Sequence, residues 1–440
     1  MVDQATADEQ YLAKADFQVL LDVLAGEGYE VLGPTLGEGA IVYGPVRRVD
    51  DLPRGWTDEQ EAGHYRLVRR NDEAWFGFVV GPQSWKQYLF PPRTRLLTAK
   101  CEHGTWKMQP AEEPVPKYAF LGVRACELAA LDVQDRVFMH SAFPDPHYVR
   151  RRQQALVIAV NCTQAAPTCF CTSMATGPRC RQGFDLALTE LAEGFVLEIG
   201  SPRGRELAAR LPLAPASEQQ CRDAADARAQ AEQQITRHLA TAGLRELLLS
   251  NLNHPHWDDV AARCLSCANC TMVCPTCFCS SVEEVSDLLG EQIARERVWD
   301  SCFNPQFSYV HGGLVRHNIR SRYRQWLTHK LATWHDQFGT SGCVGCGRCI
   351  SWCPVGIDLT QEVAGFRAAA DRALFDRRPG AGEHAASVSG QGRGPSGLSA
   401  SRPFLQQPRG ETGRPLPDEA PELGQSDAPG SESPRSTEGR

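Results

Sequence analysis

Two cysteine runs constrain this chain more than any other feature of its sequence. Each run has the spacing C-x2-C-x2-C-x3-C-P, which is the bacterial signature of cubane [4Fe–4S] clusters. The members of the two runs are Cys264, Cys267, Cys270, Cys274 and Pro275, and then Cys343, Cys346, Cys349, Cys353 and Pro354. Since the signature occurs twice, we predict two clusters.

Ligands are exchanged between such runs, because the first three cysteines bind one cluster and the fourth binds the other. We therefore predict two crossed ligand sets. The first set is Cys264, Cys267, Cys270 and Cys353. The second set is Cys343, Cys346, Cys349 and Cys274. Zinc is the alternative ion, but it prefers cysteine pairs separated by longer spacers, and three tandem steps fit it poorly.

Composition narrows the class of protein further. The 440 residues allow two or three domains, and a hydrophobic fraction of 42% is enough for a core. A net charge of −7 without a long basic stretch argues against nucleic acid as a partner. We find no secretory signal, and no apolar run approaches the roughly 20 residues of a membrane helix. Eighteen cysteines in such a chain indicate redox or metal chemistry in the cytoplasm.

The first half of the chain carries the pattern of a small α/β core. Apolar residues at 118–123 and at 156–160 predict two buried strands, and 127–137 between them reads as a helix. A helix is also predicted at 15–25 by its apolar spacing. Further short strands are predicted at 29–32, 40–43, 65–68 and 75–80.

The second half is predicted to be mostly helical. Helices are expected within 217–250 and at 282–289, 320–334 and 361–374. From Pro379 onward, 29 of the last 62 residues are Gly, Pro or Ser, so this segment cannot bury enough apolar area to fold. We predict an α+β fold with an N-terminal α/β domain at 1–215. A helical dicluster ferredoxin-like domain follows at 216–377, and a disordered tail at 378–440.

A second group of cysteines lies in the N-terminal half. Cys126 follows the predicted strand at 118–123, and Cys162, Cys169 and Cys171 follow the one at 156–160. If these strands are neighbours in one sheet, their carboxyl ends bring the four thiols together, where α/β sheets place their ligands. Four thiolates suit a third [4Fe–4S] cluster. The spacing is not a standard run, and burial as small residues is the alternative. Cys180 is a substitute ligand.

The other cysteines and the histidines are given structural roles. Cys277, Cys279 and Cys302 follow the first run closely, and we expect them to pack beside a cluster without binding it, since no fourth ligand is obvious. Cys101 and Cys221 are expected to be ordinary residues. The histidines of this region have no convincing partner set and are expected to be structural or on the surface; they are His311, His317, His329 and His335.

These motifs resemble, in order, those of a family that contains the iron–sulfur β subunit of soluble sulfhydrogenases and the corresponding iron–sulfur subunit of anaerobic sulfite reductase. The resemblance covers residues 15–365 and includes more than the cysteine runs. It rests on the stretches GPQSWK at 81–86, LGVRACEL at 121–128, CFC at 169–171, TGP at 176–178, CPTCFC at 274–279, WDSCF at 299–303 and HKL at 329–331. Glu127 stands where family members usually carry Asp, which keeps the charge. The segment 176–189 is more similar to the hydrogenase side.

The resemblance implies an electron-transfer subunit of an oxidoreductase complex, not catalytic by itself. It implies two [4Fe–4S] clusters and supports a third on Cys126, Cys162, Cys169 and Cys171. Its partners would be a flavin subunit that uses NAD(P)H and either a nickel–iron hydrogenase or a siroheme sulfite reductase.

Two other functions compete with this relay. A regulatory iron–sulfur sensor would need a DNA- or protein-binding module, and no basic recognition helix is present. A self-contained reductase would bind flavin or substrate in its N-terminal domain. The sequence has no phosphate-binding Walker run, no G-x-G-x-x-G after a strand and no nucleophile–base constellation.

Overall fold

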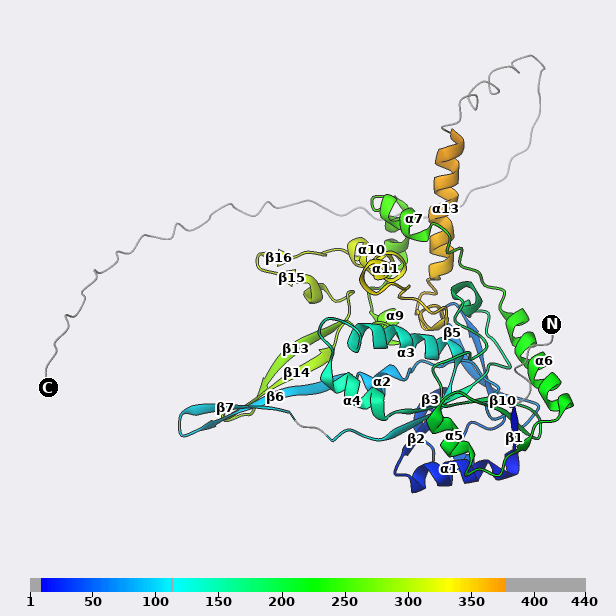
Figure 1. Cartoon of the computed structure of the whole chain (residues 1–440). Helices are drawn as coiled ribbons and strands as arrows, with labels where there is room; N and C mark the ends of the chain where they lie inside the picture. Colours follow the sequence, from blue (N-terminus) through cyan, green and yellow to red (C-terminus); the bar gives the residue numbers. More distant parts are fainter. Residues whose placement is uncertain (1–8, 112–113, 377–440) are drawn as a thin grey trace, which may run out of the picture. The chain divides into compact units, whose positions relative to one another are not determined.

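The computed structural model describes residues 9–111 and 114–376, and the predicted tail at 378–440 lies outside them. Its largest element is a mixed eight-stranded sheet, seen in Figure 1. In order across the sheet the strands are β12 (Ala214–Pro215), β1 (Gln10–Ala13), β11 (Gly194–Ile199), β10 (Leu186–Glu190), β9 (Leu156–Val160), β8 (Tyr118–Val123), β2 (Glu30–Gly37) and β3 (Ala40–Pro45). The predicted α/β fold of the N-terminal region is therefore confirmed.

The middle of this sheet is parallel. Strand β8 pairs with β9 and with β2 in parallel, and β9 pairs with β10 in the same way. Strand β9 is buried along its whole length, as a parallel strand covered on both faces should be. Helix α3 (Ala125–Phe138) connects β8 to this region and contacts both β9 and the helical part of the chain. The predicted order of strand, helix and strand is thus present.

One predicted strand is wrong, and its backbone shows why. Residues 75–80 are buried and apolar but form no ladder. The N–H groups of Trp75 and Phe76 instead donate to the carboxylate of Glu190, at 2.7 Å each. Val79 N–H donates to Asp58, also at 2.7 Å. Buried carboxylates therefore satisfy the donors that a neighbouring strand would otherwise satisfy.

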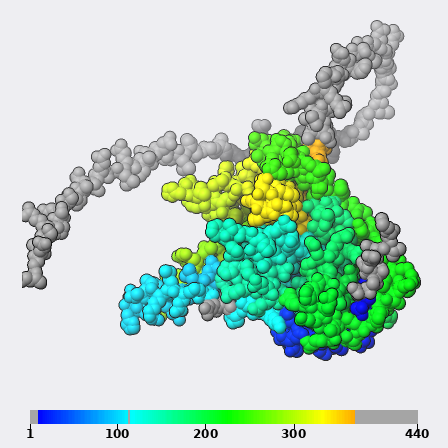
Figure 2. Space-filling model, in the orientation of Figure 1, coloured from blue at the N-terminus to red at the C-terminus, as the bar shows by residue number. Residues whose placement is uncertain are grey.

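A four-stranded antiparallel sheet forms an arm that projects from the body (Figure 2). Its strands in order are β13 (Ser280–Ser286), β14 (Gln292–Trp299), β6 (Arg93–Glu102) and β7 (Thr105–Pro110). The helix predicted at 282–289 is therefore wrong. Its apolar residues have helical spacing but are exposed, with Val282 at 56% and Leu288 fully accessible, so burial does not select a helix there. Backbone pairing with β14 makes the segment a strand.

Helices make up most of the remaining second half, as predicted. They are α6 (Glu218–Gln234), α7 (Leu244–Ser250), α8 (His256–Arg263), α9 (Asn269–Met272), α10 (Ile319–Thr328), a π-helical turn at His329–Thr333, α11 (Trp334–Phe338), α12 (Arg348–Ser351) and α13 (Leu359–Asp376). Their core contains the fully buried Trp257, Leu327 and Phe366. In the part of the chain that the structure describes, no helix is long and apolar enough to cross a membrane.

The smaller elements complete the fold. The helices are α1 (Phe17–Gly26), α2 (Lys86–Leu89), α4 (Pro146–Gln154) and α5 (Pro202–Ala208), and the hairpins are β4 (Trp56–Glu61) with β5 (His64–Arg69) and β15 (Tyr309–Val310) with β16 (Gly313–Leu314). The β4–β5 hairpin supports the second cysteine run, because Gly63 N–H donates to Ile350 O at 3.0 Å. The ring of Tyr65 also packs on Trp352.

Candidate metal centres

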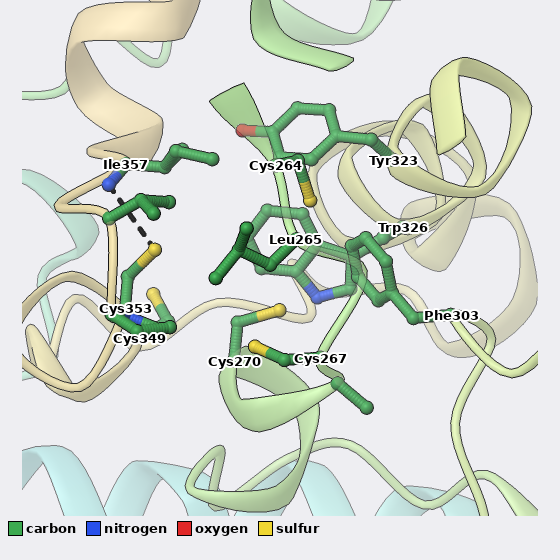
Figure 3. Close-up of a pocket in the computed structure, with 13 residues that line it drawn as sticks. Cys264, Leu265, Cys267, Cys270, Phe303, Tyr323, Trp326, Cys349, Cys353 and Ile357 are labelled. Atoms are coloured by element: carbon green, nitrogen blue, oxygen red, sulfur yellow. Dashed lines mark hydrogen bonds between the residues drawn. The ribbon is translucent and has the colours of Figure 1, made fainter. Parts of the chain in front are cut away.

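The first cysteine run wraps around a pocket beside α8. The helix ends at Arg263, and the backbone then turns through left-handed conformations at Ser266 and Ala268 before the single turn α9. Figure 3 shows the result, a pocket with the thiols of the first predicted set around it. These are Cys264, Cys267, Cys270 and Cys353. Burial and the neighbouring Cys264 and Cys353 raise the pKa of Cys270 well above its usual value.

The walls of this pocket suit an iron–sulfur cluster. Tyr323 and Trp326 line it, and the Tyr323 hydroxyl and the Trp326 Nε1 are buried without a hydrogen-bond partner among the described residues. Orphaned buried donors are costly, and cluster sulfides are acceptors that would satisfy them. The rim is open: Cys267 is exposed, and the adjacent Leu265 is 61% accessible.

The second predicted set also comes together. Burial and the neighbouring Cys343, Cys346 and Cys274 raise the pKa of Cys349 well above its usual value. Thus each of the two runs supplies a thiol to the group of the other. All four thiols must lose their protons to bind iron, so the raised pKa of Cys349 describes the protein before iron loading.

A buried lysine lies against this second set. The Lys330 ammonium donates to Cys274 Sγ at 3.2 Å, to Gly342 O at 3.0 Å and to Thr276 Oγ1 at 3.3 Å. Burial opposes its charge, but the neighbouring Cys274 and Cys277 raise the pKa of Lys330 well above its usual value. Lys330 therefore stays protonated and places a positive charge beside a ligand of the second set.

Replacing Lys330 by methionine should make the reduction potential of the second cluster more negative. The ammonium favours the electron-rich reduced state, and hydrogen bonds to cluster sulfur raise cluster potentials. The measurement is a redox titration followed by electron paramagnetic resonance (EPR). Lys100→Met, an exposed lysine on the β6 strand, is the control. An unchanged potential in Lys330→Met would contradict this role.

The four N-terminal cysteines line one further pocket. Strands β8 and β9 are parallel neighbours, so the residues after Val123 and after Val160 meet at one edge of the sheet. The pocket there is lined by Cys126, Cys162, Cys169 and Cys171, and by Cys346 of the second run. Burial raises the pKa of Cys169 to about 12, which is the expected state of a buried thiol without iron. Cys180 is buried nearby but is not part of the pocket lining.

We call these four N-terminal cysteines the third group. Two glycines allow the second cysteine run to approach it closely. Gly345 has φ +66°, and a Cβ there would meet the backbone of Cys171 at 2.7 Å and Phe170 O at 2.6 Å. Gly347 has φ +78°, and its Cβ would meet Thr168 O at 2.5 Å. Only residues without a side chain permit both the left-handed backbone and this close approach.

A buried ion pair also holds the second cysteine run against the N-terminal cysteines. Glu127 follows Cys126, and Arg348 lies between Cys346 and Cys349; both side chains are almost completely buried and they pair directly. The Glu127 carboxylate also accepts from the Tyr43 hydroxyl at 2.9 Å and from Trp85 Nε1 at 3.1 Å. The carboxylate thus connects the N-terminal sheet to the second cysteine run.

Arg124 does not pair with an acidic side chain among the described residues. Its guanidinium donates to the carbonyl oxygens of Asn161, Phe76 and Phe78. Burial raises the pKa of Cys162, and the charge of Arg124 opposes that rise. Arg124 therefore favours the thiolate form of one candidate ligand.

The three cysteines expected to pack beside a cluster form a group of their own. Cys277, Cys279 and Cys302 line one cavity of about 300 Å³. A hydrogen bond with Cys302 lowers the pKa of Cys279 to about 7. Cys101 lies on β6 and Cys221 on α6, apart from all of these groups.

Sequence reasoning missed the charged residues around the thiols. Lys330, Arg348 and Glu127 are buried charges in contact with cysteine segments, and a sequence shows neither burial nor pairing across more than 200 positions. Each still had a signal, because Arg348 stands inside the second run, and Glu127 and Lys330 stand in stretches on which the resemblance rests. Within the described residues no group of three or more Cys, His, Asp or Glu is placed to hold one metal ion. In a cubane each thiolate binds its own iron, so its ligands stand further apart.

Comparison with known proteins agrees with this geometry. The 4Fe-4S dicluster domain matches residues 263–357, which contain both cysteine runs. Sulfhydrogenase 2 subunit beta of Pyrococcus furiosus is 32% identical over 327 residues, which are 73% of this chain and 91% of that protein. The chain belongs to the sulfhydrogenase β-subunit family. No solved structure matches it.

Membership in the sulfhydrogenase β-subunit family confirms the predicted resemblance and the general type of function that it implies. The chain is an iron–sulfur electron-transfer subunit, and its dicluster domain implies two [4Fe–4S] clusters. As a subunit homologue it works within a complex. The assignment of individual cysteines and the third cluster stay predictions that the pockets described above support.

Proposed function

We propose that this chain relays single electrons between a flavin subunit that uses NAD(P)H and the catalytic subunits of a hydrogenase. When bound, [4Fe–4S] clusters accept and release one electron at a time. The main support is that the three ligand groups adjoin. Cys349 of the second set lines the pocket of the first, and Cys346 lines the pocket of the third. Together the groups form one continuous series.

The two ends of the series differ in their exposure. In the third group, Cys126, Cys169 and Cys171 are buried. In the first group, Cys267 is exposed, and Leu265 and Val355 beside it are 61% and 41% accessible. An apolar, accessible rim around one ligand group is suited to contact with another redox subunit. We therefore propose the first set as a port to a partner, and a cytoplasmic location for the complex.

Removing one ligand of the first set should interrupt the relay. In the purified complex, Cys267→Ala is expected to abolish reduction of NAD(P)⁺ by H₂ while H₂ oxidation by an artificial one-electron dye continues. Cys221→Ala, on α6 and apart from the ligand groups, should leave both rates unchanged. The rates are followed by absorbance under exclusion of oxygen.

Three results would contradict the proposal. Unchanged reduction of NAD(P)⁺ by Cys267→Ala would remove the first set from the path. A complex that reduces sulfite and does not oxidise H₂ would assign the chain to a sulfite reductase. Flavin bound to the isolated chain would instead favour a self-contained reductase.

A further inference from the structure

A hairpin brings three cysteines outside the predicted ligand sets to one place. Ser280 at the start of β13 pairs with Trp299 at the end of β14. The segments just before and just after this hairpin therefore meet, and Asp300 N–H donates to Cys279 O at 2.9 Å. Cys277 and Cys279 come from the first segment and Cys302 from the second. All three line the cavity of about 300 Å³, which the predicted clusters do not use.

A histidine completes a possible set of four ligands in that cavity. His329, on the π-helical turn after α10, lines the cavity and is half-buried. Its Nε2 lies 2.8 Å from Gln337 Oε1. Because an amide oxygen only accepts, Nε2 carries the hydrogen, and Nδ1 keeps the lone pair that a metal needs. Such support of the second ring nitrogen is typical of histidine ligands.

Two buried lysines next to these thiols have no carboxylate partner among the described residues. Lys86 is 3% accessible, donates to Cys277 O at 3.1 Å and lies 3.9 Å from the Trp299 ring centroid. Lys330 is 2% accessible and reaches Cys274 but no acid. Buried charges are normally paired. The second set supplies negative charge beside Lys330, and a further anionic group at Cys277 would supply it beside Lys86.

The cavity wall also has an unpartnered donor. Trp334 lines it, and in the part of the chain that the structure describes its Nε1 is buried without a hydrogen-bond acceptor. Trp326 lies between this cavity and the pocket of the first set, and both pockets include it. An iron–sulfur cluster has sulfide acceptors that could accept from such N–H groups.

We propose that Cys277, Cys279, Cys302 and Nδ1 of His329 bind an additional [4Fe–4S] cluster. The site adjoins the second set, because Lys330 lines this cavity and donates to Cys274 Sγ at 3.2 Å. It would lie beside the relay of the proposed function and is a claim about binding that does not require the relay to be correct. Replacing a thiolate by neutral imidazole makes a cluster less negative, so its reduction potential should lie above those of the all-cysteine clusters.

Iron content is the first test. The full chain is purified without oxygen, and iron and acid-labile sulfide are counted per chain. Cys302→Ala and Cys279→Ala should each hold about four iron atoms fewer than the unmodified chain. Cys101→Ala, a cysteine on the β6 strand, should lose none. Retention of all iron in both cavity variants would overturn the proposal.

Nitrogen coupling is the second test, and it needs no variant to fold. The unmodified chain is labelled with ¹⁵N-histidine, partly reduced with dithionite and measured by pulsed EPR. A ¹⁵N coupling is expected on the signal that appears at the highest potential, and His329→Ala should remove it. Absence of ¹⁵N coupling from all cluster signals of the unmodified chain would overturn the ligand set. If the relay of the proposed function is wrong and this cluster is present, the result is different. Iron content and ¹⁵N coupling would be as expected, but electrons would not pass between the subunits.

Discussion

Replacing Glu127 by alanine is expected to lower the free energy of unfolding by about 3–5 kcal/mol. Removing one partner of a buried ion pair leaves the other charge uncompensated, and this is costly. Here the charge left behind is that of Arg348, which is 1% accessible. The Tyr43 hydroxyl and Trp85 Nε1 would also lose their acceptor. The measurement is urea unfolding of the iron-loaded chain, followed by circular dichroism.

A matched exposed pair gives the control for this experiment. Glu284 pairs with Arg295 on the arm, and its side chain is 62% accessible. Glu284→Ala should change the free energy of unfolding by about 1 kcal/mol or less, because surface ion pairs contribute little. The double variant Glu127→Leu with Arg348→Met should be more stable than Glu127→Ala, because no charge stays buried alone. Equal effects of Glu127→Ala and Glu284→Ala would contradict the importance of the buried pair.

Replacing Cys169 by alanine should remove the third cluster and no other. We expect about four iron atoms fewer per chain, with the EPR signals of the two ferredoxin-type clusters retained. The reason is local: Cys169 lines the pocket at the edge of β8 and β9, together with Cys126, Cys162 and Cys171, and it does not line the pocket of the first set. Iron and acid-labile sulfide are counted on protein purified without oxygen.

Cys180 provides the control for the third cluster. It is as buried as Cys169 and close to Cys162, but it does not line the pocket. Cys180→Ala should therefore keep all its iron. Loss of iron from Cys180→Ala and not from Cys169→Ala would make Cys180 the ligand in place of Cys169. Full retention of iron in both variants would mean that the N-terminal cysteines only pack in the core.

The parts of the fold that could be predicted depend on local patterns. Strands 118–123 and 156–160 were located to the residue because continuous apolar runs bounded by breakers have one simple solution in an α/β protein. The pairing of β14 with β6 joins residues about 200 positions apart, and no local pattern contains it. The helix wrongly predicted at 282–289 failed for another reason. Its apolar residues are exposed, so their helical spacing does not mark a buried helix face, and the segment pairs with β14 instead.

The candidate sites divide in the same way, into features that local sequence patterns predict and features that arise from long-range contacts. Cysteine spacing was sufficient to propose the crossed ligand sets, because the spacing itself encodes which iron each thiol can reach. Spacing could not reveal the cavity around Cys302, whose partners come from three separate segments. It also could not reveal Lys86 or Lys330, because a lysine in a sequence is normally a solvated surface residue.

The pocket of Figure 3 has a consequence for biosynthesis. Cys264, Cys267 and Cys270 leave the ribosome long before Cys353, which stands on the other side of that pocket. Cys274 is likewise synthesised long before Cys343, Cys346 and Cys349, the other members of the second set. A nascent chain that ends before these positions offers three thiols to the first cluster and only Cys274 to the second. Three thiols leave one iron of the first cluster open to water and oxygen. We therefore expect iron to be inserted after translation is complete. A polypeptide truncated before these positions should hold no stable cluster.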